Sequence, residues 1–368
     1  MTGPADRALI PVTVLTGFLG SGKTTVINHL LRRPELQGVV VIVNEFGAVG
    51  LDHLLIETSE ERFALLENGC ICCSVRDDLI VTLGHLQRRR RAGALPEFTR
   101  VLVETTGLAD PVPILHTLMT SLDLAGHYRV DGVAVTVDAV NGARTLQRQD
   151  EAIKQIAVAD RIMLTKCDLV DAATVAALRR MIAAINPTAT LQPIENGSVE
   201  PASILDAGMF DPSARTQDVA AWFDAASSTG HHHGIGYAPH ENCGPDCDHK
   251  DHHHHAHDPG ISSFSLTINE PVQWAAFSRW LDYVATLKGE DLLRFKGLVQ
   301  IAERPDNPVV VHGVQHIFHP PIELKSWPSA DRATRLVFIV RNIPRDVIEN
   351  TLVRFAAIRR GAIERPAA

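Results

Sequence analysis

Long apolar segments and an excess of positive charge are both absent from this sequence. Runs such as Val39–Val43 are too short to cross a bilayer, because a membrane-spanning helix needs about 20 apolar residues. Residues 1–7 lead into a strand-like run without the apolar core and cleavage site of a secretory leader. A formal net charge of −8 provides no electrostatic footprint for nucleic acid. We therefore expect a cytoplasmic protein with no membrane partner and no nucleic-acid partner.

Cysteine is also sparse, with six in 368 residues. Cytoplasmic thiols stay reduced, so metal ligands or buried side chains are expected here rather than disulfides. The run of arginines at residues 88–91 is more typical of the solvated end of a helix than of a binding site. The chain is longer than one hydrophobic core usually supports, which predicts two domains.

The first half of the chain alternates short β-branched runs with helical patterns. Strands are expected at residues 11–16, 39–43, 100–104, 133–137 and 161–165, with a helix at about 23–33. These strands are apolar on both faces, which predicts an α/β fold with a mostly parallel sheet and helices on both faces. Ligands of such sheets bind at the carboxyl ends of the strands.

The composition changes at about Ser227. Residues 231–257 contain ten histidines and two cysteines with almost no large apolar side chains, which predicts a flexible linker. After it, strand-like runs at 264–268, 298–302, 309–311 and 336–340, a helix at 272–287 and a helix after Pro344 predict a small α+β domain. We therefore expect a P-loop domain at 1–228, a metal-binding linker at 229–260 and a C-terminal domain at 261–368.

A phosphate-binding loop is expected where the first strand meets the first helix. Gly17-x4-Gly22-Lys23-Thr24 matches the P-loop pattern, in which backbone N–H groups and Lys23 bind phosphates and Thr24 binds Mg²⁺. A dinucleotide-binding turn would fit the closely spaced glycines, but it leaves Lys23 and Thr24 unexplained. The remaining expected nucleotide-binding residues of this loop are Gly20, Ser21 and Thr25.

Two later strand ends fit the same nucleotide. Glu104 can hold the Mg²⁺ shell, and Gly107 can offer its N–H to the γ-phosphate. In Thr165-Lys166-Cys167-Asp168, the carboxylate of Asp168 can accept the two donors of guanine while the stem of Lys166 covers the base. The alternative is an ordinary turn in which Asp168 caps a helix. Thr165 replaces the more usual Asn of this motif. Whether the polar contact that Asn makes is retained here is left open.

Three cysteines, Cys70, Cys72 and Cys73, lie within four residues. Thiolates are soft ligands suited to Zn²⁺ or Cu(I), and three of them leave a coordination position open for another residue, water or a receiving protein. Small buried apolar residues are the alternative for cysteine. Cys167 is expected to be structural.

Taken together, these motifs resemble the CobW family of P-loop GTPases. The resemblance covers almost the whole chain, and it rests on residues 17–25, 44–47, 69–73, 104–111 and 165–168 and, in the C-terminal domain, on 293–297, 313–315 and 336–339. It implies a GTP- and Mg²⁺-dependent switch that carries or inserts a metal, cobalt or zinc in different members. It also implies that Asn44-Glu45-Phe46-Gly47 belongs to a nucleotide-sensing switch, with Glu45 near Mg²⁺ or the carried metal. From chemistry alone, Glu45 is also consistent with an ordinary surface carboxylate.

The histidine-rich segment has two interpretations. It is either a loose reservoir that raises the local metal concentration, or it contains a defined tetrahedral site in His240-x2-Cys243-x3-Cys247-x-His249. In both cases neutral imidazoles and thiolates favour transition metals.

The resulting hypothesis is a GTPase metallochaperone. GTP·Mg²⁺ would order the loops around Glu45 and Glu104 and thereby control the geometry of the three cysteines. Zn²⁺ is favoured as cargo and Co²⁺ remains possible. Lys23 and Glu104 are the candidate catalytic residues; no catalytic base is evident, so slow intrinsic hydrolysis is expected. The recipient is a client metalloprotein or a cofactor-synthesis enzyme, and a homodimer is possible. The alternatives are a passive metal buffer with structural nucleotide, and a P-loop ATPase or kinase.

Overall fold

The computed structural model describes residues 9–33, 36, 38–43, 63–65, 74–195, 197–205 and 260–364. For residues 63–65 and 74–78 this description is limited to the backbone. The predicted switch at 44–47, the cysteine motif at 70–73 and the histidine-rich segment lie outside the described residues. The predicted domain boundaries also fall at or near residues outside this range and stay predictions.

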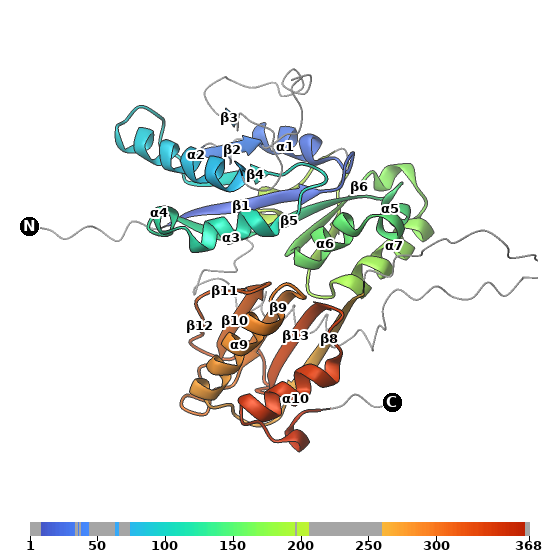
Figure 1. The fold of residues 1–368 in the computed structure, drawn as a ribbon. Coiled ribbons are helices and arrows are strands. Elements are labelled where there is room, and N and C mark those ends of the chain that lie inside the picture. The colour runs from blue at the N-terminus through green and yellow to red at the C-terminus, as the bar shows by residue number, and fades with distance from the viewer. Residues whose placement is uncertain are drawn as a thin grey trace, which may run out of the picture.

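A parallel sheet forms the first domain (Figure 1). Its described strands are β1 (Ile10–Gly17), β2 (Val39–Val43), β3 (Phe63–Leu65), β4 (Arg100–Glu104), β5 (Tyr128–Asp138), β6 (Arg161–Thr165) and β7 (Thr190–Pro193). They are ordered β3-β2-β4-β1-β5-β6-β7, and every neighbouring pair is parallel. This confirms the predicted sheet and brings the ends of β1, β4, β5 and β6 to one edge.

Helices cover both faces of this sheet. They are α1 (Lys23–Leu31), α2 (Ser74–Arg91), α3 (Val112–Thr120), α4 (Leu122–Ala125), α5 (Gly142–Arg148), α6 (Asp150–Val158) and α7 (Ala172–Ile185). Along β5, Ala134 packs in the same apolar cluster as α1, whereas Val133 and Val135 pack with the other helices. Successive side chains of a strand point to opposite faces, so α1 lies on one face and α5 and α6 on the other. The arginine run at 88–91 ends α2, as expected.

The second domain is an antiparallel sheet with helices, which confirms the predicted α+β domain. Its described elements are β8 (Ile261–Ile268), α9 (Trp274–Lys288), β9 (Leu292–Val299), β10 (Val309–Val314), β11 (Ile317–Phe318), β12 (Ile322–Glu323), β13 (Thr334–Arg341) and α10 (Arg345–Phe355). The strand order is β11-β10-β9-β13-β8, with β12 paired to β10. Trp280, Phe295 and Phe338 form its aromatic core, with ring centroids 5.1 to 6.3 Å apart.

One predicted strand was misplaced. A strand was expected at 298–302, but β9 covers Leu292–Val299 and all its residues are buried. Arg294 and Lys296 interrupt the apolar pattern, which hid the first half of the strand. Both side chains are buried because they reach the carboxylate of Asp160 in the first domain.

The two domains meet through a buried interface. In Figure 1 the second domain, orange to red, lies against the part of the first domain that carries α6 and α7, and α6 contacts β9 while α7 contacts β8. Leu293, Val314 and Ile339 of the second domain join the apolar cluster of the first. The parallel sheet domain and the C-terminal domain are therefore packed against each other at this face.

None of the helices in the described part of the chain has the length and apolar character needed to cross a membrane.

Candidate nucleotide-binding site

The loop between β1 and α1 has the geometry of a phosphate cradle. Gly17 has a φ of 143°, and a Cβ there would lie 2.3 Å from Oγ1 of Thr136 on β5. Gly20 and Gly22 also have positive φ. The loop thus curves tightly over the end of the sheet in a way that only glycine permits at Gly17. The hydroxyls of Ser21 and Thr136, 2.6 Å apart, fasten the loop to β5.

Lys23 and Thr24 begin the helix that follows this loop. Lys23 is only 9% exposed, and its Nζ donates to the carbonyl oxygen of Gly17 at 2.8 Å. Its ammonium group is therefore held against the loop. Thr24 is half-buried and Thr25 is exposed. Together with the N-terminal end of α1, this arrangement suits the binding of an anion.

The loop after β4 packs directly on the cradle. Glu104 is buried at the end of β4, where it pairs with Leu15 of β1 in the sheet register. Thr105 donates from its Oγ1 to Oγ1 of Thr16 at 2.6 Å. A Cβ on Gly107 would lie 2.6 Å from the backbone nitrogen of Leu19, so this close approach requires glycine. The structure thus brings the loop with Glu104 and Gly107 next to the predicted phosphate-binding loop.

The motif after β6 is also tied to the cradle. Lys166 has a φ of 57°, which is unusual for a residue other than glycine. Its Nζ donates to the carbonyl oxygen of Gly20 at 2.9 Å and to Oδ2 of Asp138 at 2.8 Å. Thr165 donates from Oγ1 to the carbonyl oxygen of Ser21 at 2.8 Å. Thr165 therefore makes a polar link between this motif and the cradle.

Asp168 does not cap the next helix. It lies exposed in a short 3-10 turn, Cys167–Leu169, whereas α7 is capped by Asp171, which accepts from the backbone N–H of Thr174 at 2.7 Å. The helix-cap alternative for Asp168 is thus wrong. Cys167 is half-buried, its Sγ lies 3.5 Å from the carbonyl oxygen of Leu164, and burial raises the pKa of its thiol. These features fit the structural role expected for Cys167.

Asp138 is a site residue that sequence reasoning missed. It ends β5 and accepts hydrogen bonds from Lys166, from Nδ2 of Asn141 at 2.9 Å and from the N–H of Val140 at 2.7 Å. Burial alone would raise the pKa of its carboxyl, but these hydrogen bonds outweigh burial and hold the pKa below its usual value. An acidic residue directly after the apolar run 133–137 was the available signal, since Glu104 occupies the same kind of position.

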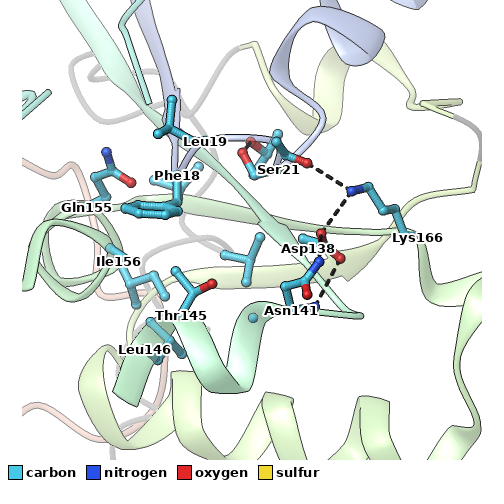
Figure 2. A pocket seen from close by; sticks show the side chains of 16 residues that line it. Phe18, Leu19, Ser21, Asp138, Asn141, Thr145, Leu146, Gln155, Ile156 and Lys166 are labelled. Carbon is cyan, nitrogen blue, oxygen red and sulfur yellow. Dashed lines mark hydrogen bonds and ion pairs between the residues drawn. The ribbon is translucent and has the colours of Figure 1, made fainter. Parts of the chain in front are cut away.

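A cavity of about 190 Å³ lies beside the cradle (Figure 2). It is lined by Phe18 and Leu19 of the loop, by the end of β5, by α5 and by α6. It therefore lies on the sheet face opposite α1. Gln155 of α6 lines it and is 1% exposed.

The predicted metal ligands cannot be placed in this way. Cys70, Cys72 and Cys73, the candidate set His240, Cys243, Cys247 and His249, and Glu45 all lie outside the described residues. Within the described ranges, no three His, Cys, Asp or Glu side chains come together as a metal-binding group.

Comparison with known proteins bears on both domains. Residues 11–193 match the family profile described as "CobW/HypB/UreG, nucleotide-binding domain", and residues 261–356 match "Cobalamin synthesis protein cobW C-terminal domain". The chain is 31% identical over 351 residues to the protein named "Zinc chaperone YjiA" of Escherichia coli strain K12, covering 95% of this chain and 99% of that protein. The chain belongs to the CobW family.

Further relatives are similar along most of their length. "Zinc chaperone CobW" of Sinorhizobium is 30% identical over 337 residues, covering 83% of this chain and 85% of that protein. "Zinc-regulated GTPase metalloprotein activator 1" of Dictyostelium discoideum is 28% identical over 404 residues, covering 93% and 79%. The crystal structure of Zn(II)-bound YjiA GTPase from E. coli has a TM-score of 0.65 at 24% identity, covering 95% of this chain and 99% of that chain, which shows the same fold.

Proposed function

We propose that this CobW-family chain is a GTP-hydrolysing zinc chaperone that transfers its metal to a client protein under nucleotide control. The observation that supports GTP binding is a pair of hydrogen bonds. Thr165 donates to Ser21 of the cradle and Lys166 donates to Gly20. They make base recognition and phosphate binding one connected site. The metal half is supported by the cysteine motif and by relatives named zinc chaperones.

Guanine is the base that this site suits. Asp168 is an exposed carboxylate on the turn after β6, and it can accept the N1–H and the exocyclic amine of guanine together. Adenine has no such adjacent donor pair. Lys166 is fixed at its Nζ by Gly20 and Asp138, so its stem is held in place to cover the base. The phosphates would extend from there over the cradle to Lys23.

The residues present fit Mg²⁺. Thr24 and Glu104 offer a hydroxyl and a carboxylate, which are the hard oxygen ligands that Mg²⁺ prefers. Glu104 is 6% exposed and ends β4 beside the cradle. We propose Glu45 as a further ligand of this shell. Bound Mg²⁺ would neutralise charge on the β- and γ-phosphate oxygens. Lys23 would stabilise the charge that develops there during hydrolysis.

Zinc is the proposed cargo and cobalt the second candidate. Cys70, Cys72 and Cys73 would hold it as thiolates, which leaves one position of a tetrahedral shell for the client. His240, Cys243, Cys247 and His249 are a second proposed site that could supply metal to the first. GTP would hold the loops near Glu104 in one arrangement, and hydrolysis would release them and the metal.

The test is zinc affinity as a function of nucleotide. Zinc binding is measured on wild type and on Cys72→Ser with a non-hydrolysable GTP analogue, with GDP and with no nucleotide. We expect wild-type affinity to differ between analogue and GDP, and Cys72→Ser to abolish that difference. The matched control is deletion of residues 231–257, which should lower zinc capacity but keep the difference. Equal affinity in all three nucleotide states would favour the passive buffer and reject the coupling.

A further inference from the structure

Gln155 clamps the loop that follows β4. Its Nε2 donates to the carbonyl oxygen of Gly107 at 3.2 Å and to that of Ala109 at 3.0 Å. The N–H of Ala109 in turn donates to the carbonyl oxygen of Thr106 at 3.1 Å, which closes a tight turn. The side-chain amide of Gln155 therefore binds two carbonyl groups of this turn. Gly107 is thereby held between Gln155 and the backbone of Leu19 in the cradle.

Gln155 binds the loop at the residue proposed to contact the γ-phosphate. Under the proposed function, the backbone N–H of Gly107 is the group that contacts this phosphate. A peptide unit whose carbonyl is bound by Gln155 has a fixed orientation, so the position of Gln155 helps to set the direction of the neighbouring N–H groups. GDP has no γ-phosphate and makes no such contact.

The helix that carries Gln155 ends at the C-terminal domain. α6 has nine residues and at about 1.5 Å per residue is about 13 Å long. Asp160 lies two residues after the last residue of α6, and its carboxylate binds Arg294 and, at 3.4 Å, Nζ of Lys296, both from β9. The other carboxylate oxygen of Asp160 accepts from the N–H of Val133 at 3.0 Å. The far end of α6 is thus fixed to both domains.

A second contact stiffens this end. Nδ2 of Asn186, at the end of α7, donates to the carbonyl oxygens of Ile156 at 2.8 Å and Ala159 at 2.9 Å. The last carbonyls of a helix otherwise lack partners within it. These bonds hold the C-terminal end of α6 against the end of α7, so α6 forms a continuous hydrogen-bonded connection between Gln155 and Asp160.

Gln155 also has a way to move. Its Oε1 is buried and has no hydrogen-bond partner among the described residues. Figure 2 shows the side chain near Phe18, and both residues line the cavity beside the cradle. A buried acceptor without a partner is costly, and the cavity leaves room for the carboxamide to change its partners.

We propose that Gln155 is a positioning residue for the γ-phosphate contact of Gly107, and that α6 couples this contact to the Arg294 and Lys296 pair of the C-terminal domain. This inference rests on the proposed GTPase function. In this proposal the C-terminal domain responds to the nucleotide state, and α6 is the element that connects the two.

The test uses the full-length protein with Gln155→Met, which keeps the side-chain length and removes the donors. Affinities for GDP and for a non-hydrolysable GTP analogue are measured by fluorescence titration. We expect analogue affinity to fall about five- to tenfold, as for a lost buried hydrogen bond, with GDP affinity unchanged. Gln155→Glu, which keeps the volume, is measured alongside and is expected to show the same selective loss, so a folding defect in one variant does not decide the result.

The long-range part is tested by a double-mutant cycle. Lys296→Met leaves the pair of Asp160 and Arg294 intact and should change the ratio of analogue to GDP affinity by about twofold, whereas adding it to Gln155→Met should change nothing further. Ser263→Ala is the matched control, because it removes an interdomain hydrogen bond to Ala184 of α7 rather than to α6, and should leave the ratio unchanged.

Each outcome decides one idea. Equal weakening of GDP and analogue by both Gln155 variants shows a merely structural role and overturns the proposal, while the proposed function stands. Additive effects in the cycle, or an equal effect of Ser263→Ala, overturn the coupling through α6. A wild-type protein that binds neither guanine nucleotide instead rejects the proposed function itself.

Discussion

Thr165 donates a hydrogen bond of 2.8 Å from its Oγ1 to the carbonyl oxygen of Ser21. Thr165 is 5% exposed and Ser21 is 2% exposed, so water does not compete for this bond. It crosses from the end of β6 to the loop after β1, two segments far apart in the sequence. Under the proposed function, the segment that would bind the base is therefore linked to the loop that would bind the phosphates.

This bond gives the first prediction. Thr165→Val removes the hydroxyl and keeps the shape, and it should weaken GTP and GDP alike by about two- to tenfold. GTP and GDP would both contact the base-binding motif and the cradle, so no selectivity between them is expected. Isothermal titration measures the two affinities. Thr165→Ser retains the hydroxyl and serves as the control; a valine variant with wild-type affinity would show that the bond is dispensable.

The assignment of Asp168 to guanine recognition predicts that a substitution there changes the preferred nucleotide. Asp168→Asn exchanges a double acceptor for a group that also donates, so GTP affinity should fall by about a hundredfold, as for two lost charge-assisted hydrogen bonds. Xanthosine triphosphate, whose C2 carbonyl accepts where guanine donates, should gain affinity. The exposed position of Asp168 makes a folding defect unexpected. Tight ATP binding that survives this substitution would reject guanine and favour the ATPase alternative.

The close packing of the loop after β4 on the cradle predicts a variant that loses GTP hydrolysis but keeps GDP binding. Gly107→Ala would place a Cβ 2.6 Å from the backbone nitrogen of Leu19, so the loop must move away from the cradle. Steady-state GTP hydrolysis should fall at least about tenfold, while GDP affinity stays near wild type. Gly126→Ala is the matched control, because a Cβ there meets nothing within 4 Å. A parallel loss of GDP affinity would instead indicate that the whole cradle is distorted.

The domain interface predicts a pH dependence of stability. Burial lowers the pKa of Lys296 to about 8, although Asp160 acts in the opposite direction. The unfolded lysine keeps its usual pKa near 10.5, so between these values the unfolded state binds more protons and stability rises with pH. We expect denaturation midpoints of wild type, compared with Lys296→Met, to increase from pH 8 toward pH 10. A difference that is constant or falls over this window would contradict the lowered pKa.

The sequence predicted the strands that stand alone as apolar runs. Residues 39–43, 100–104 and 161–165 match β2, β4 and β6 in full, because buried parallel strands carry a continuous apolar pattern between turns. The first half of β9 was hidden by Arg294 and Lys296, whose burial depends on a carboxylate more than 130 positions earlier. The edge strand β7 was missed because none of its residues is fully buried and they carry no such pattern.

The candidate site follows the same division. The cradle, Glu104, Gly107 and the motif at 165–168 were predicted because each is a local pattern at a strand end. Gln155 could not be found, since nothing in its helix tells which backbone carbonyls its amide will reach. Its partners at Gly107 and Ala109 come from another element and appear only when the chain is folded.

The ion cluster at Asp160 also bears on how this protein can be divided. Separation of the two domains would expose a carboxylate on one part and two cations on the other, together with the apolar side chains around them. Two polypeptides cut between residues 205 and 260 should therefore recognise each other and reassemble without a covalent connection. The arrangement of the domains would then be a property of their surfaces, and the length of chain between them would be free to differ among relatives.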